Sequence, residues 1–265
     1  MRRADGTATR ADIESEPDVA ARMAEAYNAA SRGDYPAALA IWGPLAQAGV
    51  ARARNNVGAC FAEGLGLERD PALAVRWLTL AAEAGDAVGR RNLAALYFRG
   101  EGIDQDHARA AALYRAAAEV GDGPAQDMLS WMLLEGEAAP FDASKARRWA
   151  LAAAEQGVAS AMTRLGMIYH NALGVDRNPA TAATWWAKAA TRGDADGQAM
   201  LGAAHLLGAG VPRDRVAALA WLLRSSACGS ALAAPFLNNA RRALTADEIS
   251  EAERRAAAPL PEPVP

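Results

Sequence analysis

Apolar residues and glycines recur along the chain with a step of 36 residues. One apolar column holds Val57, Leu93, Leu129, Leu165, Leu201 and Leu237. A glycine column holds Gly49, Gly85, Gly121, Gly157, Gly193 and Gly229, and a second holds Gly64, Gly100, Gly136, Ala172 and Gly208. A fixed step over five gapless periods is the signature of a repeat protein.

Each period contains two apolar patterns with helical spacing, separated by a glycine turn. In the first full period we expect a helix over 51–63, ended by the turn at Gly64–Gly66. The second helix starts after an Asp or Asn, whose side chain can accept hydrogen bonds from helix-start amides. That column holds Asp70, Asp106, Asp142, Asn178 and Asp214, and the candidate caps of the following helices are Asp86, Asp122 and Asp194. Gly85 and its equivalents suit the left-handed conformation that follows a helix end.

Two further columns predict how the helices pack. Small residues at 58, 94, 130, 166 and 202 mark positions where one helix backbone lies against its neighbour. A second column places a large apolar side chain between helices in every period, a tryptophan in four of the five: Trp77, Leu113, Trp149, Trp185 and Trp221. We therefore expect these tryptophans to belong to the core.

The pattern resembles Sel1-like repeats, which are relatives of tetratricopeptide repeats. The clearest copy contains Leu165-Gly166 through Tyr169, Gly174-Val175, Ala182, Trp185-Trp186 and Ala189-Ala190, and the resemblance covers about 51–229. It implies an all-α, right-handed superhelical solenoid of antiparallel helix pairs, with first helices lining a concave face. The motif is specific for this fold and poorly specific for function.

The ends of the chain depart from the period, as terminal units of a solenoid do. Residues 18–49 are similar to a tetratricopeptide helix pair with a short connection at 31–35, and residues 230–258 are expected to form capping helices. Thr245 and Glu248 fit a capping box. The full repeats are then 50–85, 86–121, 122–157, 158–193 and 194–229, between a disordered segment at 1–17 and a proline-rich tail at 259–265.

Charge and composition narrow the classes of function. The 265 residues carry 28 basic and 31 acidic side chains, a net charge of −3. A nucleic-acid binder would normally show a basic excess, so that class is disfavoured. We find no apolar run of membrane-spanning length and no secretory signal, and expect a cytoplasmic protein without membrane insertion.

Candidate catalytic chemistry is sparse. The chain has 2 cysteines and 3 histidines and lacks the common phosphate-loop, zinc-helix and nucleophile-elbow motifs. Cys60 and Cys228 lie almost five repeats apart and are expected to be buried, unpaired side chains. We expect no metal, no cofactor and no enzyme activity.

One group of residues departs from the repeat in a way that packing does not require. Trp131 stands in a column that otherwise holds Ala59, Ala95, Met167 and Ala203, and Met128 precedes it by one helical turn. Arg164 occupies the column of Met128 in the next period. Trp131, Met128, Arg164 and Met167 would therefore form an apolar patch with one cation, rich in residues typical of interfaces. The alternative is a locally repacked tryptophan.

Neighbouring variable positions on the same face alternate in charge. They include Asn55, Arg91, Asp127 and Thr163. This surface is either ordinary solvated surface or part of a mixed-charge contact in which Arg91 and Asp127 take part.

These observations favour an adaptor or scaffold that binds a protein or peptide on the concave face. The candidate partner-binding residues are Met128, Trp131, Arg164, Met167, Arg91 and Asp127. Two alternatives remain open: an enzyme resembling the β-lactam hydrolases described among Sel1-like proteins, and a self-assembling structural protein that forms homo-oligomers.

Overall fold

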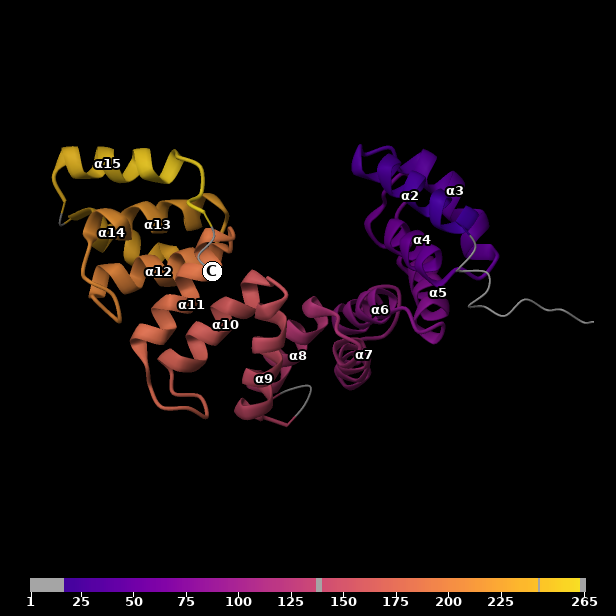
Figure 1. Cartoon of the computed structure of the whole chain (residues 1–265), viewed down its shortest axis with the longest axis horizontal. Helices are drawn as coiled ribbons and strands as arrows, with labels where there is room; N and C mark the ends of the chain where they lie inside the picture. The colour runs from indigo at the N-terminus through magenta and orange to yellow at the C-terminus, as the bar shows by residue number, and fades with distance from the viewer. Residues whose placement is uncertain (1–16, 137–139, 243, 263–265) are drawn as a thin grey trace, which may run out of the picture. The chain divides into compact units, whose positions relative to one another are not determined.

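The computed structural model describes residues 17–136, 140–242 and 244–262, and within them all regular structure is helical (Figure 1). The predicted disordered segment 1–17, apart from Pro17, and the last three residues of the tail lie outside this part of the chain. The helices are α2 (Pro17–Ser31), α3 (Tyr35–Gln47), α4 (Ala51–Glu63), α5 (Pro71–Glu83), α6 (Ala87–Arg99), α7 (His107–Glu119), α8 (Gly123–Glu135), α9 (Ala143–Glu155), α10 (Ala159–His170), α11 (Pro179–Thr191), α12 (Ala195–Leu207), α13 (Arg215–Ala227), η1 (Ala231–Ala233), α14 (Ala234–Arg242) and α15 (Ala246–Ala257).

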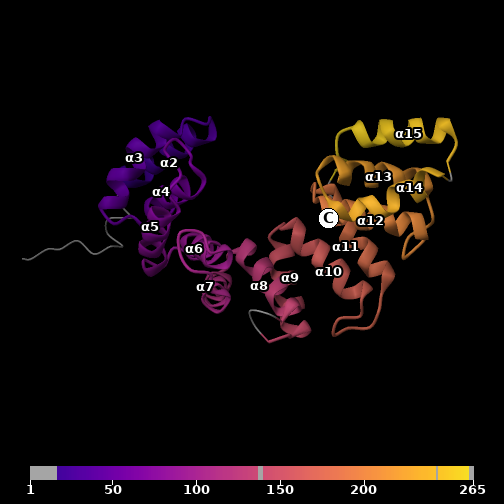
Figure 2. The same ribbon diagram turned by 180° about the vertical axis from the view of Figure 1, so that it is seen from behind.

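Neighbouring helices along the chain pack against each other, in two compact units that divide after Ala125. Within the first unit α4 contacts α5 and α6, and within the second α10 contacts α11 and α12 (Figures 1 and 2). In both units, a first helix therefore touches the second helix of its own period and the first helix of the next. This sequential packing is that of an α-solenoid, as the repeat pattern predicts.

The helix boundaries follow the predicted caps. The side chains of Asp70, Asp106, Asp142, Asn178 and Asp214 each accept a hydrogen bond from a backbone amide three residues later. Asp86, Asp122 and Asp194 cap the following first helices in the same way. Gly64 and Gly100 end α4 and α6 in the left-handed conformation. At the other end of the chain the capping box of Thr245 and Glu248 starts α15.

The small-residue column is the place of closest helix approach. A Cβ atom added to Gly58 would lie 2.7 Å from Leu78, and one on Gly202 would lie 2.8 Å from Leu222. Ser130, in the same column, is fully buried and donates from Oγ to the carbonyl of Ala146, at 2.8 Å.

A second set of glycines holds successive repeats together. Gly102, in the turn after α6, lies so close to the backbone of Pro71 at the start of α5 that a side chain would collide with it. Gly210, after α12, meets Pro179 at the start of α11 in the same way. Each glycine turn is thus seated on the second helix of the preceding repeat.

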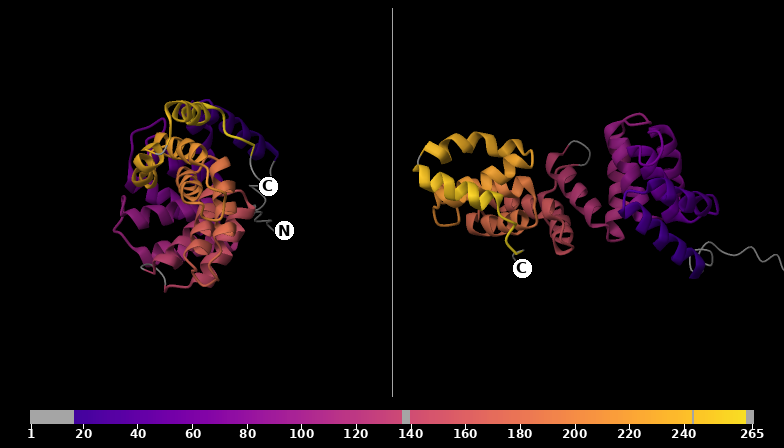
Figure 3. Two further views of the ribbon diagram at one scale, coloured as in Figure 1. Left: turned by 90° about the vertical axis from the view of Figure 1, so that its left-hand side faces the viewer. Right: turned by 90° about the horizontal axis from the view of Figure 1, so that it is seen from above.

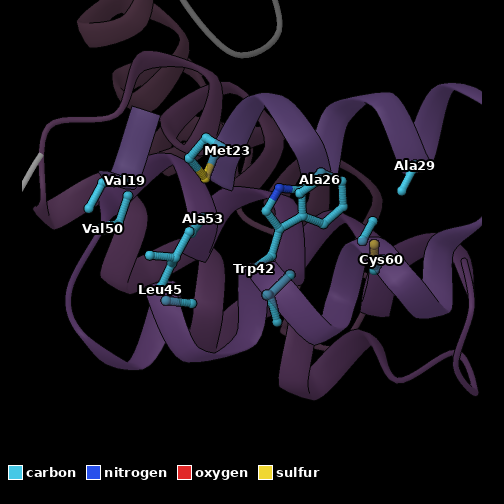
Figure 4. Packing of buried hydrophobic residues seen from close by; sticks show 12 residues of the cluster. Val19, Met23, Ala26, Ala29, Trp42, Leu45, Val50, Ala53 and Cys60 are labelled. Carbon is cyan, nitrogen blue, oxygen red and sulfur yellow. The ribbon is translucent and has the colours of Figure 1, made fainter. Parts of the chain in front are cut away.

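The core of the first unit begins with α2, α3 and α4 (Figure 4). Trp42 is 4% exposed and packs beside Met23 and Ala26, with the ring of Tyr27 edge-on at 5.8 Å. In the second unit, α15 packs against α13 (Figure 3). Ile249 and Ala252 of α15 belong to the last core cluster, together with residues of α13 and α14.

The repeated tryptophans do not fill the core as predicted. Trp77, Trp149, Trp185 and Trp221 are half-buried at its edge, whereas the next position along each second helix is buried. That position holds Leu78, Tyr114, Ala150, Trp186 and Leu222. Three of the edge tryptophans carry a cation over the ring, from Arg148, Lys188 and Arg224. Each of these tryptophans therefore lies at the boundary between core and solvent.

The two cysteines differ. Cys60 is 2% exposed, and burial raises its pKa to about 11. Cys228 is exposed at the end of α13, so the prediction that both are buried was wrong for Cys228. Its position at a helix end, outside the apolar columns of the repeat, explains the difference.

Candidate partner-binding site

Part of the variable column on the first helices links repeats. Arg91 on α6 donates from Nη1 to both carboxylate oxygens of Asp122, at 2.9 and 3.1 Å. Thr163 on α10 donates from Oγ1 to Asp194 at 3.4 Å. Both acceptors are the N-caps of the next first helix, 31 residues further on. Asn55, Asp127 and Thr163 are buried, so this column is not the solvated surface that alternating charge suggested.

Asp127 makes the link differently, because the next helix lacks an Asp cap. Val158 precedes α10 and has no side-chain hydrogen bond to it. Asp127, 6% exposed, instead accepts 2.6 Å from Ser160 Oγ and 3.0 Å from Arg164 Nε. The guanidinium of Arg164 is thereby held in one place and its charge is balanced.

Beside this ion pair lies an open pocket of about 470 Å³ on the first-helix side of the second unit. Trp131 is half-buried in it, while Met167 and Leu232 are 38% and 43% exposed. Leu134 and Leu173 add further apolar surface. The lining residues are Trp131, Leu134, Glu135, Ser160, Thr163, Arg164, Met167, Leu173, Asp194, Asp196 and Leu232.

The charged side chains of the pocket are mainly acidic. Glu135 and Asp196 are exposed, and Asp196 accepts a hydrogen bond of 2.6 Å from Ser230. Burial raises the pKa of Asp194 above its usual range, and the negative charges of Asp196 and Asp127 act in the same direction. Among the lining residues the structure describes, Arg164 is the single cation, and Asp127 already pairs with it. The pocket therefore presents an apolar floor with an acidic surround.

The structure brings together three of the six candidate residues, Trp131, Arg164 and Met167. Met128 is half-buried and does not line the pocket. Asp127 is the ion-pair partner of Arg164 and does not line the pocket. Arg91 belongs to the first unit and pairs with Asp122 instead.

Sequence reasoning missed the residues that later repeats contribute. Leu232 comes from η1, and Asp194 and Asp196 come from the start of α12. The sequence did contain one signal for Leu232. It is an apolar residue shortly after Gly229, the last glycine of the repeat, at a position to which the helix pattern assigns no place in the core.

No group of three or more His, Cys, Asp or Glu in the described part of the chain is arranged to hold a metal ion. Across 17–136, 140–242 and 244–262, none of the helices combines the length and apolarity needed to cross a membrane.

Comparison with known proteins supports the repeat assignment. The family model described as Sel1 repeat matches five consecutive segments, 51–86, 87–122, 123–158, 159–194 and 195–230. A Sel1 repeat protein from Oxalobacter formigenes has a similar structure, with a TM-score of 0.78 and 26% identity over 91% of this chain and 99% of its own. The immunity protein Pa5087 from Pseudomonas aeruginosa shares the fold, with a TM-score of 0.50 and 19% identity over 93% of this chain and 85% of its own. No curated protein matches the sequence.

Proposed function

The chain belongs to the Sel1 repeat family, and we propose that it is a non-enzymatic adaptor whose Trp131 pocket binds a polypeptide partner. The proposal places the adaptor in the cytoplasm, where two free thiols persist in reduced form.

The observation that carries this proposal is the exposure of large apolar side chains within one pocket. Trp131 and Met167 come from two successive repeats and Leu232 comes from η1, after the last repeat, and each leaves part of its surface open. Exposed apolar surface rimmed by polar groups is typical of binding sites. Trp and Met are enriched in interface cores, and Trp is a frequent hot spot.

The charges of the pocket define the chemistry of the partner. Because Asp127 balances Arg164, the remaining carboxylates of Glu135, Asp194 and Asp196 give the pocket a net negative character. A partner segment with an apolar side chain for the floor and a Lys or Arg for the rim would complement it. This is a sharper expectation than the mixed-charge partner inferred from sequence.

A peptide library displayed on phage tests the proposal. Selection on the wild-type chain should enrich peptides that combine an aromatic or aliphatic anchor with a basic residue. Met167→Asp and Trp131→Ala should each weaken the selected peptides about tenfold or more, because the apolar floor is lost.

Two variants serve as matched controls. Leu207→Asp places the same charge on a 64% exposed apolar residue of α12 outside the pocket, and Trp185→Ala removes a half-buried tryptophan from α11. Both should retain affinity. Peptides that bind the Met167→Asp chain as tightly as the wild type would refute the pocket assignment.

The absence of enzyme activity is tested separately. Incubation of the purified chain with a chromogenic β-lactam should give hydrolysis no faster than buffer. Turnover that saturates with substrate would contradict the adaptor proposal and favour the hydrolase alternative.

A further inference from the structure

The chain carries a second apolar surface, on α13, and its own proline-rich tail lies on it. We call this surface the Trp221 shelf and define it by Ala217, Ala220, Trp221 and Arg224, which share one face of the helix. Ala258, Pro259 and Pro261 line the same pocket of about 310 Å³ from the tail side. The shelf lies on a second helix and is separate from the Trp131 pocket, whose lining it does not share.

The tail is extended where it reaches the shelf. Helix α15 ends at Ala257, and Ala258 has φ −66° and ψ 158°, close to the polyproline II conformation. A residue before proline favours such angles, and Pro259 and Pro261 restrict the backbone of the segment that follows. Between these two prolines, the side chain of Leu260 lies beside Gly193, at the turn after α11.

Arg224 joins the shelf to the backbone of the tail. Its guanidinium lies over the ring of Trp221, 5.7 Å from the centroid. Nη2 donates to the carbonyl oxygens of Ala258 at 2.6 Å and Pro259 at 3.3 Å, and to that of Arg255. A proline-rich chain lacks many backbone donors but keeps every carbonyl, so a donor beside an aromatic ring suits it.

Helix capping accounts for only part of this arrangement. The carbonyl of Arg255 belongs to the last turn of α15, where helix acceptors need external donors. Ala258 and Pro259 lie beyond the helix, and capping does not require Pro259 or Pro261 to share a pocket with Trp221. The combination of aromatic face, carbonyl donor and extended proline segment is that of a polyproline recognition groove.

We propose that the Trp221 shelf is a binding site for proline-rich extended segments of another polypeptide, and that the chain's own tail occupies it as an intramolecular competitor. A short tether gives the tail an effective concentration in the millimolar range. An external segment therefore binds only when it exceeds that competition or when the tail is displaced.

The preceding repeat supplies an internal control. Trp185 lies 36 residues before Trp221, and Lys188 lies over its ring at 5.0 Å, in the place that Arg224 takes. Lys188 keeps the cation and the ring contact, but an ammonium lacks the planar donor fork of arginine. The Trp185 site therefore tests whether a tryptophan with a cation is sufficient.

The experiment uses the full-length chain and a labelled nine-residue peptide with the sequence of residues 257–265. The competitor tail is weakened in place by the double substitution Pro259→Gly/Pro261→Gly. Fluorescence anisotropy should then give a dissociation constant for the peptide about tenfold lower than that of the wild-type chain, because the resident segment has lost its stiffness and its proline contacts.

Substitutions of the shelf are then made in the tail-weakened chain. Arg224→Ala should abolish peptide binding and Arg224→Lys should weaken it, whereas Lys188→Ala should leave it unchanged. Since Arg224 lies at the surface of α13, helix content by circular dichroism should stay constant across the set. A peptide with every proline replaced by alanine should bind at least several-fold more weakly.

Three results would overturn the proposal. The first is equal peptide affinity in the wild-type and tail-weakened chains, and the second is peptide binding that Arg224→Ala and Lys188→Ala weaken equally. The third is a wild-type dimer by light scattering that free peptide converts to monomer, which would assign the shelf to tail exchange between two copies.

Discussion

The indole of Trp186 on α11 lies directly over Gly166 on α10, and its Nε1 donates to the carbonyl of Thr163 at 3.3 Å. A Cβ atom on Gly166 would fall well inside van der Waals contact with the indole ring. Trp186 is 1% exposed, so the ring has no free volume to move into. The largest buried side chain of this repeat thus depends on the smallest residue of the facing helix.

Gly166→Ala should therefore destabilise the protein by about 2 kcal/mol, through overpacking. Urea unfolding followed by tryptophan fluorescence measures the change. Gly43→Ala is the matched control: Gly43 lies within α3 with open space around its Cβ position, and the same change there should stabilise by about 0.5–1 kcal/mol. Effects of the same sign at both sites would contradict the packing argument.

Replacing Ala172 by glycine should stabilise the protein. Ala172 has φ 58° and is the one non-glycine residue with positive φ among the described residues. It stands in the column that otherwise holds Gly64, Gly100, Gly136 and Gly208. Because the left-handed region costs an L-residue about 1 kcal/mol, Ala172→Gly should raise the free energy of unfolding by about that amount.

An alanine on a helix surface provides the comparison. Ala112 is exposed within α7, and Ala112→Gly should lower stability by about 1 kcal/mol. Thermal unfolding of the two variants should move the midpoint in opposite directions. A loss of stability in Ala172→Gly would show that this turn does not constrain the residue.

The ion pair behind the pocket should contribute measurably to stability. Arg164 and Asp127 have side chains 18% and 9% exposed, so removing one leaves the other partly buried and unpaired. Asp127→Ala should cost about 2 kcal/mol. A double-mutant cycle with Arg164→Ala isolates the coupling energy.

The exposed ion pair of Lys145 and Asp142 is the control for that measurement. Lys145 is 63% exposed, and Lys145→Ala should change stability by no more than about 0.5 kcal/mol. If Asp127→Ala is equally mild, Asp127 does not hold Arg164 in solution.

Asp194 should make the free energy of unfolding depend on pH. Its folded pKa is raised, chiefly by burial, so the folded state binds this proton more tightly than the unfolded state. Its contribution to stability therefore falls as pH rises from the usual Asp range through the raised pKa. Asp194→Asn removes this contribution.

Urea midpoints of the wild type and Asp194→Asn, measured from about pH 4 to pH 7, test the sign. The variant should gain relative to the wild type as pH rises. A variant that instead loses stability relative to the wild type as pH rises would mean that folding favours the carboxylate, through its hydrogen bond from the amide of Gly197.

The thiols should differ in reactivity. Cys60 is buried with a raised pKa, whereas Cys228 is exposed. Because the thiolate is the reacting form, a chromogenic disulfide reagent near pH 8 should modify one thiol quickly and the second only on unfolding. In Cys228→Ser the fast phase should disappear. A fast phase that persists would place Cys60 within reach of solvent.

The repeat made most of the fold predictable. Glycine turns and Asp caps are local signals, because each acts on its own segment of backbone, and α4 begins and ends where its sequence pattern predicts. Burial across helices was harder to predict. Trp185 and Trp186 are adjacent and chemically identical, and only the direction of each side chain determines that Trp186 is the buried one.

Only part of the candidate site could be predicted, because contacts between separate helices are not local signals in the sequence. Trp131 and Met167 stood out because they break their column, whereas Leu232 enters the pocket from η1, outside the repeat register. Arg91 and Asp127 looked equivalent in sequence. They differ because Arg91 donates to the Asp cap of the next first helix, whereas α10 has Val158 at that position and Asp127 accepts from Ser160 and Arg164 within α10.

The seating of Gly102 on Pro71, and of Gly210 on Pro179, fixes how such a chain can change in length. An insertion of a few residues between a turn and its helix would lift the glycine off the preceding repeat and open the stack at that point. Addition of a complete 36-residue segment preserves every seat. Arrays of this kind can therefore be lengthened or shortened by whole modules, and the distance between two binding surfaces on one chain can be adjusted in fixed steps.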